Sequence, residues 1–164
     1  AIDDGPLPSA MLAQPCGITT DGQRLYFADS ETSSVRSADI DPSGRVRTIV
    51  GLDLFVFGDV DGSDHNVRLQ HPIGINYYDG VLYIADTYNH KIKKVLPVTR
   101  SAFTVLGDGT VGHVDGLAGQ SRFAEPSGIS FANGKMYIAD TNNHSIRVME
   151  FESETVSTLE LNGF

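Results

Sequence analysis

Hydrophobic and polar residues alternate along this chain in short runs, and a turn signal closes each run. In the first third of the chain, the runs CGITT, RLYFADS, SVRSADI and VRTIVG are rich in Ile, Val, Tyr and Thr, the residues that β-strands favour. TDGQ and DPSG separate them, and Asp-Gly supplies the positive φ angles of tight hairpins. No stretch has the period of an amphipathic helix. The pattern predicts short antiparallel strands and no helix.

The same pattern occurs three times with constant spacing. YIAD stands at residues 83–86 and 137–140, each time followed by an Asn-His pair, and YFAD at 26–29 is a weaker copy. Each copy starts at an Asp-Gly pair, with a proline, a glycine and the Asp of the phrase at fixed distances from it. These positions are Asp4, Asp61 and Asp115; Pro15, Pro72 and Pro126; Gly17, Gly74 and Gly128; and Asp29, Asp86 and Asp140. Four strands repeated every ~40–55 residues are typical of β-propeller blades.

We therefore predict an all-β protein, a β-propeller of three four-stranded antiparallel blades. The blades are expected at about residues 14–51, 71–107 and 125–162, joined by the loops 1–13, 52–70 and 108–124 within one module, 1–164. Closed propellers typically have about 4–8 blades, so three blades leave two faces open. We expect a second copy of the chain to complete six blades. The alternative is a longer chain whose further blades close the ring.

Several repeated positions are expected to be structural. The Asp of each phrase should accept N–H bonds in the turn that follows its strand, so Asp86→Ala or Asp140→Ala should cost about 1–2 kcal/mol. The Asn of each Asn-His pair suits a left-handed turn position. The predicted structural set is Asp29, Asp86, Asp140, Asn89, His90, Asn143, His144, Gly17, Gly74 and Gly128.

The segments YIADTYNHKIKKV and YIADTNNHSIRVM resemble the NHL repeat, with Lys91 and Ser145 in place of its Leu. Together with FVFGDVDGSDHNVRLQHPIGI, they resemble the C-terminal half of the propeller in proteins that join a thioredoxin-like domain to a six-bladed NHL propeller. The redox site of those proteins lies in the thioredoxin-like domain, and this chain has no Cys-x-x-Cys. The resemblance implies a scaffold that binds partners, as most NHL propellers do. A minority of the family are lyases that hold a metal through histidines in the central channel.

Charge and composition narrow the partners. A net charge of −9 disfavours a nucleic-acid partner, because binding to the phosphate backbone depends on Lys and Arg. No apolar stretch approaches the ~18 residues of a membrane helix, and no signal peptide is visible. The one cysteine, Cys16, cannot form an intrachain disulfide and is expected to be a small buried residue. We expect a soluble chain without a membrane partner, whose compartment the sequence does not reveal.

No catalytic or metal-binding motif stands out. A catalytic zinc needs three converging protein ligands, yet the predicted innermost strands GIT, GIN and GIS contain no histidine. GDVDGSDHN begins like a calcium loop, but Gln70 stands where that loop needs a glutamate. We expect no catalytic residue, no metal and no cofactor. The alternative is an NHL-type enzyme with a metal or small-molecule site in the channel.

One equivalent position carries three different polar residues. Gln14, His71 and Glu125 precede the blade prolines, where the chain enters the innermost strand near one mouth of the channel. Binding residues concentrate on loops that a rigid scaffold positions. We therefore predict that these three residues bind a protein or small ligand. The alternative is that they only satisfy backbone groups of the turns.

Overall fold

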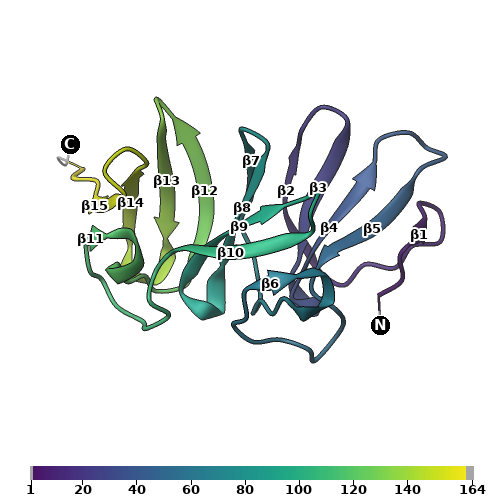
Figure 1. Ribbon diagram of the computed structural model, residues 1–164, viewed down its shortest axis with the longest axis horizontal. Helices are drawn as coiled ribbons and strands as arrows, with labels where there is room; N and C mark the ends of the chain where they lie inside the picture. Colours follow the sequence, from purple (N-terminus) through teal and green to yellow (C-terminus); the bar gives the residue numbers. More distant parts are fainter. Residues whose placement is uncertain (1, 162–164) are drawn as a thin grey trace.

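Three antiparallel sheets follow one another along the chain in the computed structural model, which describes residues 2–161. Figure 1 shows them side by side, with the two ends of the chain at opposite ends of the row. Within each sheet, the four long strands pair in chain order. The predicted all-β fold of three antiparallel blades is confirmed.

Each copy of the repeat supplies the long strands of one blade. Blade 1 consists of β2 (Pro15–Thr20), β3 (Arg24–Asp29), β4 (Ser34–Asp39) and β5 (Arg45–Val50). Blade 2 consists of β7 (Ile75–Tyr78), β8 (Val81–Asp86), β9 (Lys91–Leu96) and β10 (Ser101–Leu106). Blade 3 consists of β12 (Pro126–Ala132), β13 (Lys135–Asp140), β14 (Ser145–Glu150) and β15 (Thr155–Thr158).

Within residues 2–161, helical structure is limited to single 3-10 turns, although the sequence predicted no helix. One turn links the second and third strands of each blade: η1 (Ser30–Thr32), η3 (Thr87–Asn89) and η5 (Thr141–Asn143). Two more, η2 (Asp64–Asn66) and η4 (Ala118–Gln120), lie in the loops between blades. Among the described residues, none of these helices is long and apolar enough to cross a membrane.

Each sheet also has a fifth strand that the sequence pattern did not predict. These two-residue strands are β1 (Gly5–Pro6), β6 (Gly62–Ser63) and β11 (Gly116–Leu117), and each pairs with the outermost long strand of the blade that follows it. Their first residues are the glycines of the three Asp-Gly pairs. The Gly of each Asp-Gly pair therefore begins a short strand, which ties the loop to the outer edge of its own blade.

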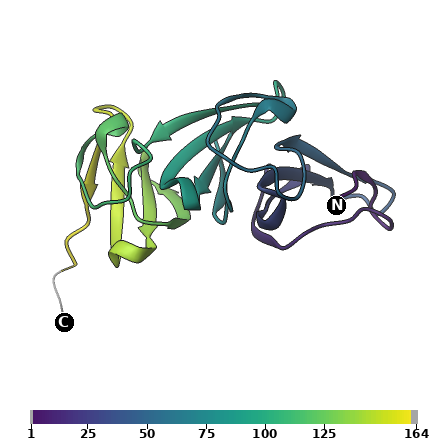
Figure 2. The same ribbon diagram turned by 90° about the horizontal axis from the view of Figure 1, so that it is seen from below.

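The first long strand of each blade is innermost. β7 lies next to both β2 and β12, and the blades follow an arc when seen from below (Figure 2). Hairpins join the first two long strands of each blade, and these hairpins point to the top of Figure 1. The 3-10 turns that follow β3, β8 and β13 lie at the other end of the sheets, because those strands run away from the hairpins.

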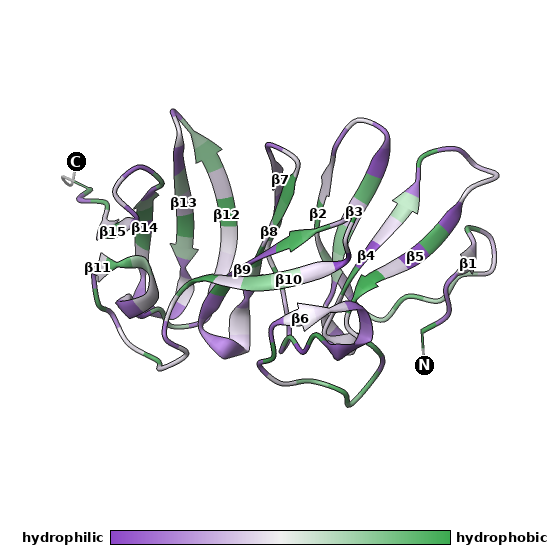
Figure 3. Cartoon of the chain, viewed as in Figure 1, coloured by the Kyte–Doolittle hydropathy of each residue, from purple (hydrophilic) through white to green (hydrophobic). Residues whose placement is uncertain are grey.

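The core lies between the blades. Figure 3 shows hydrophobic segments on strands such as β8, β12 and β13. One buried cluster joins blades 1 and 2 through residues such as Val35 and Ile84, and another joins blades 2 and 3 through residues such as Ile92 and Met136. Each face that meets another blade is thus buried, which explains why the phrase recurs.

The outer faces of blades 1 and 3 lack such a neighbour within the described residues. Ile146 of blade 3 is 37% exposed, whereas its equivalent Ile92 is fully buried against blade 3. Ile18 of blade 1 is 62% exposed, and its equivalent Ile75 only 7%. The two open faces therefore repeat the apolar surfaces that are buried inside the chain.

Candidate functional site

The three residues predicted to bind a ligand share an unusual backbone conformation. Gln14, His71 and Glu125 have φ angles of 64°, 46° and 51°. Residues other than glycine take such angles rarely. Each of the three directly precedes the proline of its copy of the repeat, at the end of the blade where η1, η3 and η5 lie. The repeat thus fixes the backbone at this position and leaves the side chain free to differ.

This position also forms part of the joint between blades. The backbone N–H of His71 donates to Ser33 Oγ at 3.3 Å, and that of Glu125 donates to His90 Nδ1 at 3.1 Å. Ser33 and His90 belong to the preceding blade and end η1 and η3. The expected alternative, that these residues only satisfy backbone groups of the turns, stays a prediction.

The side chain of His71 lies between two residues that the sequence did not single out. Its ring stacks on Tyr88, with centroids 4.8 Å apart, and its Nε2 lies 3.3 Å from Glu31 Oε1. Glu31 and Tyr88 are exposed and occupy the same position of η1 and η3. Gln14 is exposed, and His71 and Glu125 are half-buried. We call these five residues the mouth surface.

The mouth surface offers hydrogen bonding, charge and aromatic stacking. It contains an imidazole, two carboxyl groups, an amide and a phenol ring. No serine or cysteine nucleophile is among them. The described residues also contain no group of three or more His, Cys, Asp and Glu side chains that could hold a metal ion.

The Asp of each repeated phrase holds the backbone next to the mouth surface by hydrogen bonds. Asp29, Asp86 and Asp140 are fully buried. Their carboxylates accept the backbone N–H of the residue just before each mouth position, at 2.9, 2.7 and 2.8 Å: Ala13, Gln70 and Ala124. None of these three side chains caps the 3-10 turn that follows it. The prediction that each Asp caps its own turn is wrong, because the buried carboxylate points to the entering segment.

A buried cation, which the sequence pattern was not used to predict, faces each of these carboxylates. Arg36 Nη1 lies 2.9 Å from Asp29 Oδ2, Lys93 Nζ lies 3.7 Å from Asp86 Oδ2, and Arg147 Nη1 lies 2.7 Å from Asp140 Oδ2. All three cations are fully buried in the third long strands. A signal did exist, because each cation stands at the same distance from its Asp-Gly pair.

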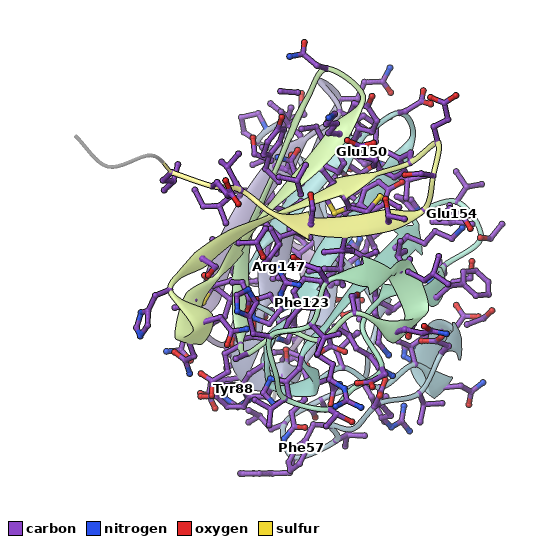
Figure 4. The ribbon with its side chains drawn as sticks, turned by 90° about the vertical axis from the view of Figure 1, so that its left-hand side faces the viewer. Phe57, Tyr88, Phe123, Arg147, Glu150 and Glu154 are labelled. Carbon is purple, nitrogen blue, oxygen red and sulfur yellow. The ribbon has the colours of Figure 1, made fainter. Side chains whose placement is uncertain are left out.

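The Asp of the Asp-Gly pair completes each network. Arg147 Nη2 lies 2.7 Å from Asp115 Oδ1, and Thr158 of the outer strand donates both its N–H and its hydroxyl to Asp115. Partial burial alone would raise the pKa of Asp115, but the bonds from Arg147 and Thr158 outweigh it and hold the pKa below its usual value. Figure 4 shows Arg147 beside Phe123, whose ring centroid is 4.9 Å from the guanidinium carbon.

Blade 2 differs because its cation is a lysine. Burial raises the pKa of Asp86 to about 6, and the attraction of Lys93 offsets burial only in part. Burial alone would lower the pKa of Lys93, but the carboxylates of Asp86, Asp59 and Asp61 outweigh it and raise the pKa. A lysine has a single ammonium group and cannot form the two-pronged bonds of a guanidinium. The distance between the charged atoms of Asp86 and Lys93 is therefore longer than in the equivalent pairs of blades 1 and 3.

The Asn-His pairs are structural in a different way from that predicted. His90 and His144 take the left-handed position, with φ of 55° and 51°. Asn89 donates to Asp86 Oδ2 at 2.8 Å and to the carbonyl of Gly58 at 2.6 Å, and Asn143 makes the same bonds in blade 3. The prediction that Asn takes the left-handed position is wrong, because its amide must reach the Asp and the loop.

The repeated glycines allow the blades to approach closely. A Cβ atom added to Gly17 would lie 2.5 Å from the carbonyl oxygen of Ile73, and one added to Gly74 would lie 2.4 Å from that of Ser127. Both oxygens belong to the next blade. Gly128 has no such neighbour among the described residues, since a Cβ there would meet only the Ala139 side chain at 3.3 Å.

Cys16 is exposed on the open face of blade 1. The expectation that it is a buried small residue is therefore wrong. Its equivalents Ile73 and Ser127 are half-buried because the preceding blade packs beside them. Among the described residues, no blade packs beside Cys16 in this way.

Comparisons with known proteins agree with the repeat. A family model described as NHL repeat matches residues 123–149. Protein SUPPRESSOR OF QUENCHING 1, chloroplastic, from Arabidopsis thaliana is 43% identical over 164 residues, covering 92% of this chain and 16% of that protein. NHL repeat-containing protein 2 from Homo sapiens is 42% identical over 166 residues, covering 93% of this chain and 23% of that protein. The chain spans less than a quarter of the length of these relatives.

Solved structures share the architecture at low identity. An auxiliary nutrient binding protein from Bacteroides ovatus has a TM-score of 0.71 at 21% identity, covering 85% of this chain and 36% of that chain. Virginiamycin B lyase from Staphylococcus aureus has a TM-score of 0.59 at 14% identity, covering 92% of this chain and 42% of that chain. At such identities the likeness shows the fold alone. The predicted propeller architecture is confirmed.

Proposed function

Because this chain is built from NHL-repeat β-propeller blades, we propose that it is a binding scaffold without catalysis of its own. Its mouth surface receives a protein or a small ligand. The observation that carries this proposal is the contrast at one position. The backbone there is the same in all three blades, whereas Gln14, His71 and Glu125 are chemically different. A rigid frame with variable polar residues on one rim is typical of a recognition surface.

The surroundings of His71 support the same proposal. Its ring is held by Tyr88 on one side and by Glu31 on the other, so its orientation is set before a ligand arrives. Side chains that are ordered in advance lose less entropy on binding. Glu125 adds a carboxyl group from the next blade. A ligand with hydrogen-bond donors or a cationic group suits this rim.

Amide NMR tests the proposal directly. A fragment library and a peptide library are screened against the uniformly labelled chain, and the ligands are mapped by their shifts. We expect the shifts to gather on the amides around His71, Tyr88 and Glu125. His71→Ala and Glu125→Ala should each weaken binding at least fivefold. Gln23→Ala, at an exposed hairpin tip of the opposite end, should leave binding unchanged.

Two results would contradict the scaffold. Ligands that map to the hairpin tips at the opposite end would rule out the mouth surface. One equivalent of tightly bound zinc or calcium per purified chain would favour the alternative, an enzyme with a site in the central channel. That alternative stays a prediction.

We also propose that the chain associates with itself. The open face of blade 3 repeats the face by which blade 2 contacts blade 3, and the open face of blade 1 repeats its counterpart. A second copy can therefore dock at both faces, and two copies supply six blades. Further blades of a longer chain are the competing occupant.

A further inference from the structure

A cavity of about 450 Å³ opens between blades 1 and 2, on the outer part of the sheets. Strands β3, β4 and β5 form one wall, and η2 with the turn between β9 and β10 forms the other. Arg24 lines it at the opposite end of β3 from Asp29, so the cavity is separate from the mouth surface. Its volume is within the range of about 300–1,000 Å³ that is usual for small-molecule sites.

The cavity is lined by cations, although the chain is acidic. Arg24, Arg47 and Arg100 all line it. Arg24 and Arg47 share the carboxylate of Asp39, at 3.3 and 2.9 Å, and Arg100 pairs with Asp64 at 3.0 Å. Two carboxylates thus serve three guanidinium groups. Each guanidinium has five N–H donors, so donors remain for a ligand.

The one acidic residue in the wall is already engaged. Asp4 accepts bonds from the buried Arg36 and from the N–H and hydroxyl of Thr48. Burial alone would raise the pKa of Asp4, but these bonds hold it below its usual value. The negative charge of Asp4 is therefore already compensated by Arg36 and Thr48.

Apolar atoms complete the lining. Tyr26, Ile49 and Pro97 lie beside the guanidinium groups. The Tyr26 hydroxyl donates to Asp21 Oδ2 at 2.8 Å, and burial together with this bond raises the pKa of Tyr26 to about 12. The ring is therefore neutral at ordinary pH, so it adds an apolar surface without a negative charge.

The same place between blades 2 and 3 has aromatic side chains and none of the three arginines. Phe151 stands there at the position of Pro97, and its ring centroid lies 6.0 Å from that of Tyr83 and 6.2 Å from that of Phe131. The positions of the three arginines hold Val81, Phe103 and Glu154. The cavity and its charge both come from residues that distinguish one joint from the other, and neither is a general property of the repeat.

We propose that this cavity binds a small organic anion. Its carboxylate or phosphate group accepts hydrogen bonds from the three guanidinium groups, whose planar geometry suits both kinds of oxyanion. Its apolar part packs against Tyr26, Ile49 and Pro97. The ligand class is thus an oxyanion carried on a small apolar or aromatic body.

Matched probes test the ligand class. Phenyl phosphate, benzoate and the neutral benzamide are titrated separately into the labelled chain and followed by amide NMR. We expect at least one of the two anions to shift the amides of Ile49, His65 and Arg100 with saturation, and the tighter anion identifies the preferred group. Benzamide at the same concentration should cause no such shifts. Absence of binding by both anions up to about 10 mM, or equal binding of benzamide, would overturn the proposal.

Variants that introduce the equivalent residues of the joint between blades 2 and 3 test whether the anion binds in this cavity. Pro97→Phe should fill the cavity with a ring like that of Phe151, and Arg100→Glu should reverse a charge as Glu154 does; each should weaken anion binding at least tenfold. Arg122→Glu is the control, because the Arg122 side chain is as exposed as that of Arg100 but lies elsewhere. It should change affinity less than twofold. If Pro97→Phe fails to fold, Arg24→Val takes its place. Unchanged affinity in the cavity variants would refute the site.

Discussion

At the scale of single residues, the buried ion pairs hold the candidate mouth in place. Asp140 is fully buried between Arg147, Asn143 and the backbone of Ala124. Removing one partner of a buried pair leaves the other charge uncompensated, at a cost of about 3–5 kcal/mol. Asp140→Ala should therefore cost about 3–5 kcal/mol rather than the 1–2 expected for a lost turn bond. Urea unfolding measures this. Asp108→Ala, the exposed partner of Arg122, is the control and should cost clearly less than Asp140→Ala, because water screens exposed ion pairs.

Lys93→Arg gives a prediction with a defined pH dependence. The folded pKa of Asp86 is about 6, above its usual 3.8, so folding favours the protonated acid. That contribution is complete below pH 3.8 and is lost as the pH rises through 6. An arginine, as in blades 1 and 3, should pair more closely with Asp86 and lower its pKa. The stability gained by Lys93→Arg should therefore grow between about pH 4 and 7. A gain that is constant with pH, or that shrinks, would contradict this account.

Residue spacing predicted which aspartates are structural but not what they bind. Asp29, Asp86 and Asp140 were found because the repeat keeps them at one distance. Their partners lie on another strand and in a loop, so only the folded blade brings the charges together. Tyr88 and Glu31 were not singled out for a different reason: only the folded chain brings η3 and η1 beside His71.

At the scale of elements, the joint between blades depends on a bare glycine. A methyl group at Gly74 would collide with the carbonyl of Ser127, which is backbone of blade 3 and cannot move aside cheaply. Gly74→Ala should destabilise the chain by about 1–3 kcal/mol, the usual cost of overpacking. Both changes are made in the Ile18→Glu variant, whose charge on an open face should keep the chain monomeric. There Gly128→Ala is the matched control and should cost less than about 1 kcal/mol. Thermal unfolding of both variants checks this; equal losses would contradict the role of the next blade.

Strand prediction succeeded where the pattern was long enough. The four long strands of each blade have alternating runs and turn dipeptides, so they could be read directly. A two-residue strand such as β6 has no pattern of its own and forms only because the outer strand offers partners. The left-handed turn residue was misassigned because propensity favoured Asn, whereas tertiary bonds required the amide of Asn89 elsewhere.

At the scale of the whole molecule, the open faces predict self-association. Light scattering of the purified chain should give about twice its mass of 17.7 kDa. Ile18→Glu and Ile146→Glu should each shift the chain to the single mass, because they place a charge on an apolar face. Val111→Glu is the control, since Val111 is 60% exposed in a loop between blades. A well-folded species at 17.7 kDa would contradict self-association. The same holds if Gly128→Ala changes neither the mass nor the stability of that species.

The arrangement of the blades could be deduced from the repeat alone, but the cavities and binding surfaces between them could not. Spacing fixes how one blade follows the next, since each joint uses the same glycine and the same proline. The cavity between blades 1 and 2 was invisible to that reasoning, because it arises where the copies differ, as at Pro97 and Phe151.

The short fifth strands have a consequence for how this chain can aggregate. An unpaired strand edge is a template for adding further strands, and such addition leads to fibres. Here the outer edge of blade 1 is partly covered by β1, and the next free N–H, that of Thr48, is held by the carboxylate of Asp4. Asp61 and Asp115 hold the N–H groups of Thr104 and Thr158 in the same way. Among the inner strands, β7 lies next to both β2 and β12. Contacts between molecules are thereby confined to side chains on the blade faces, which favours reversible complexes of limited size over amyloid-like growth.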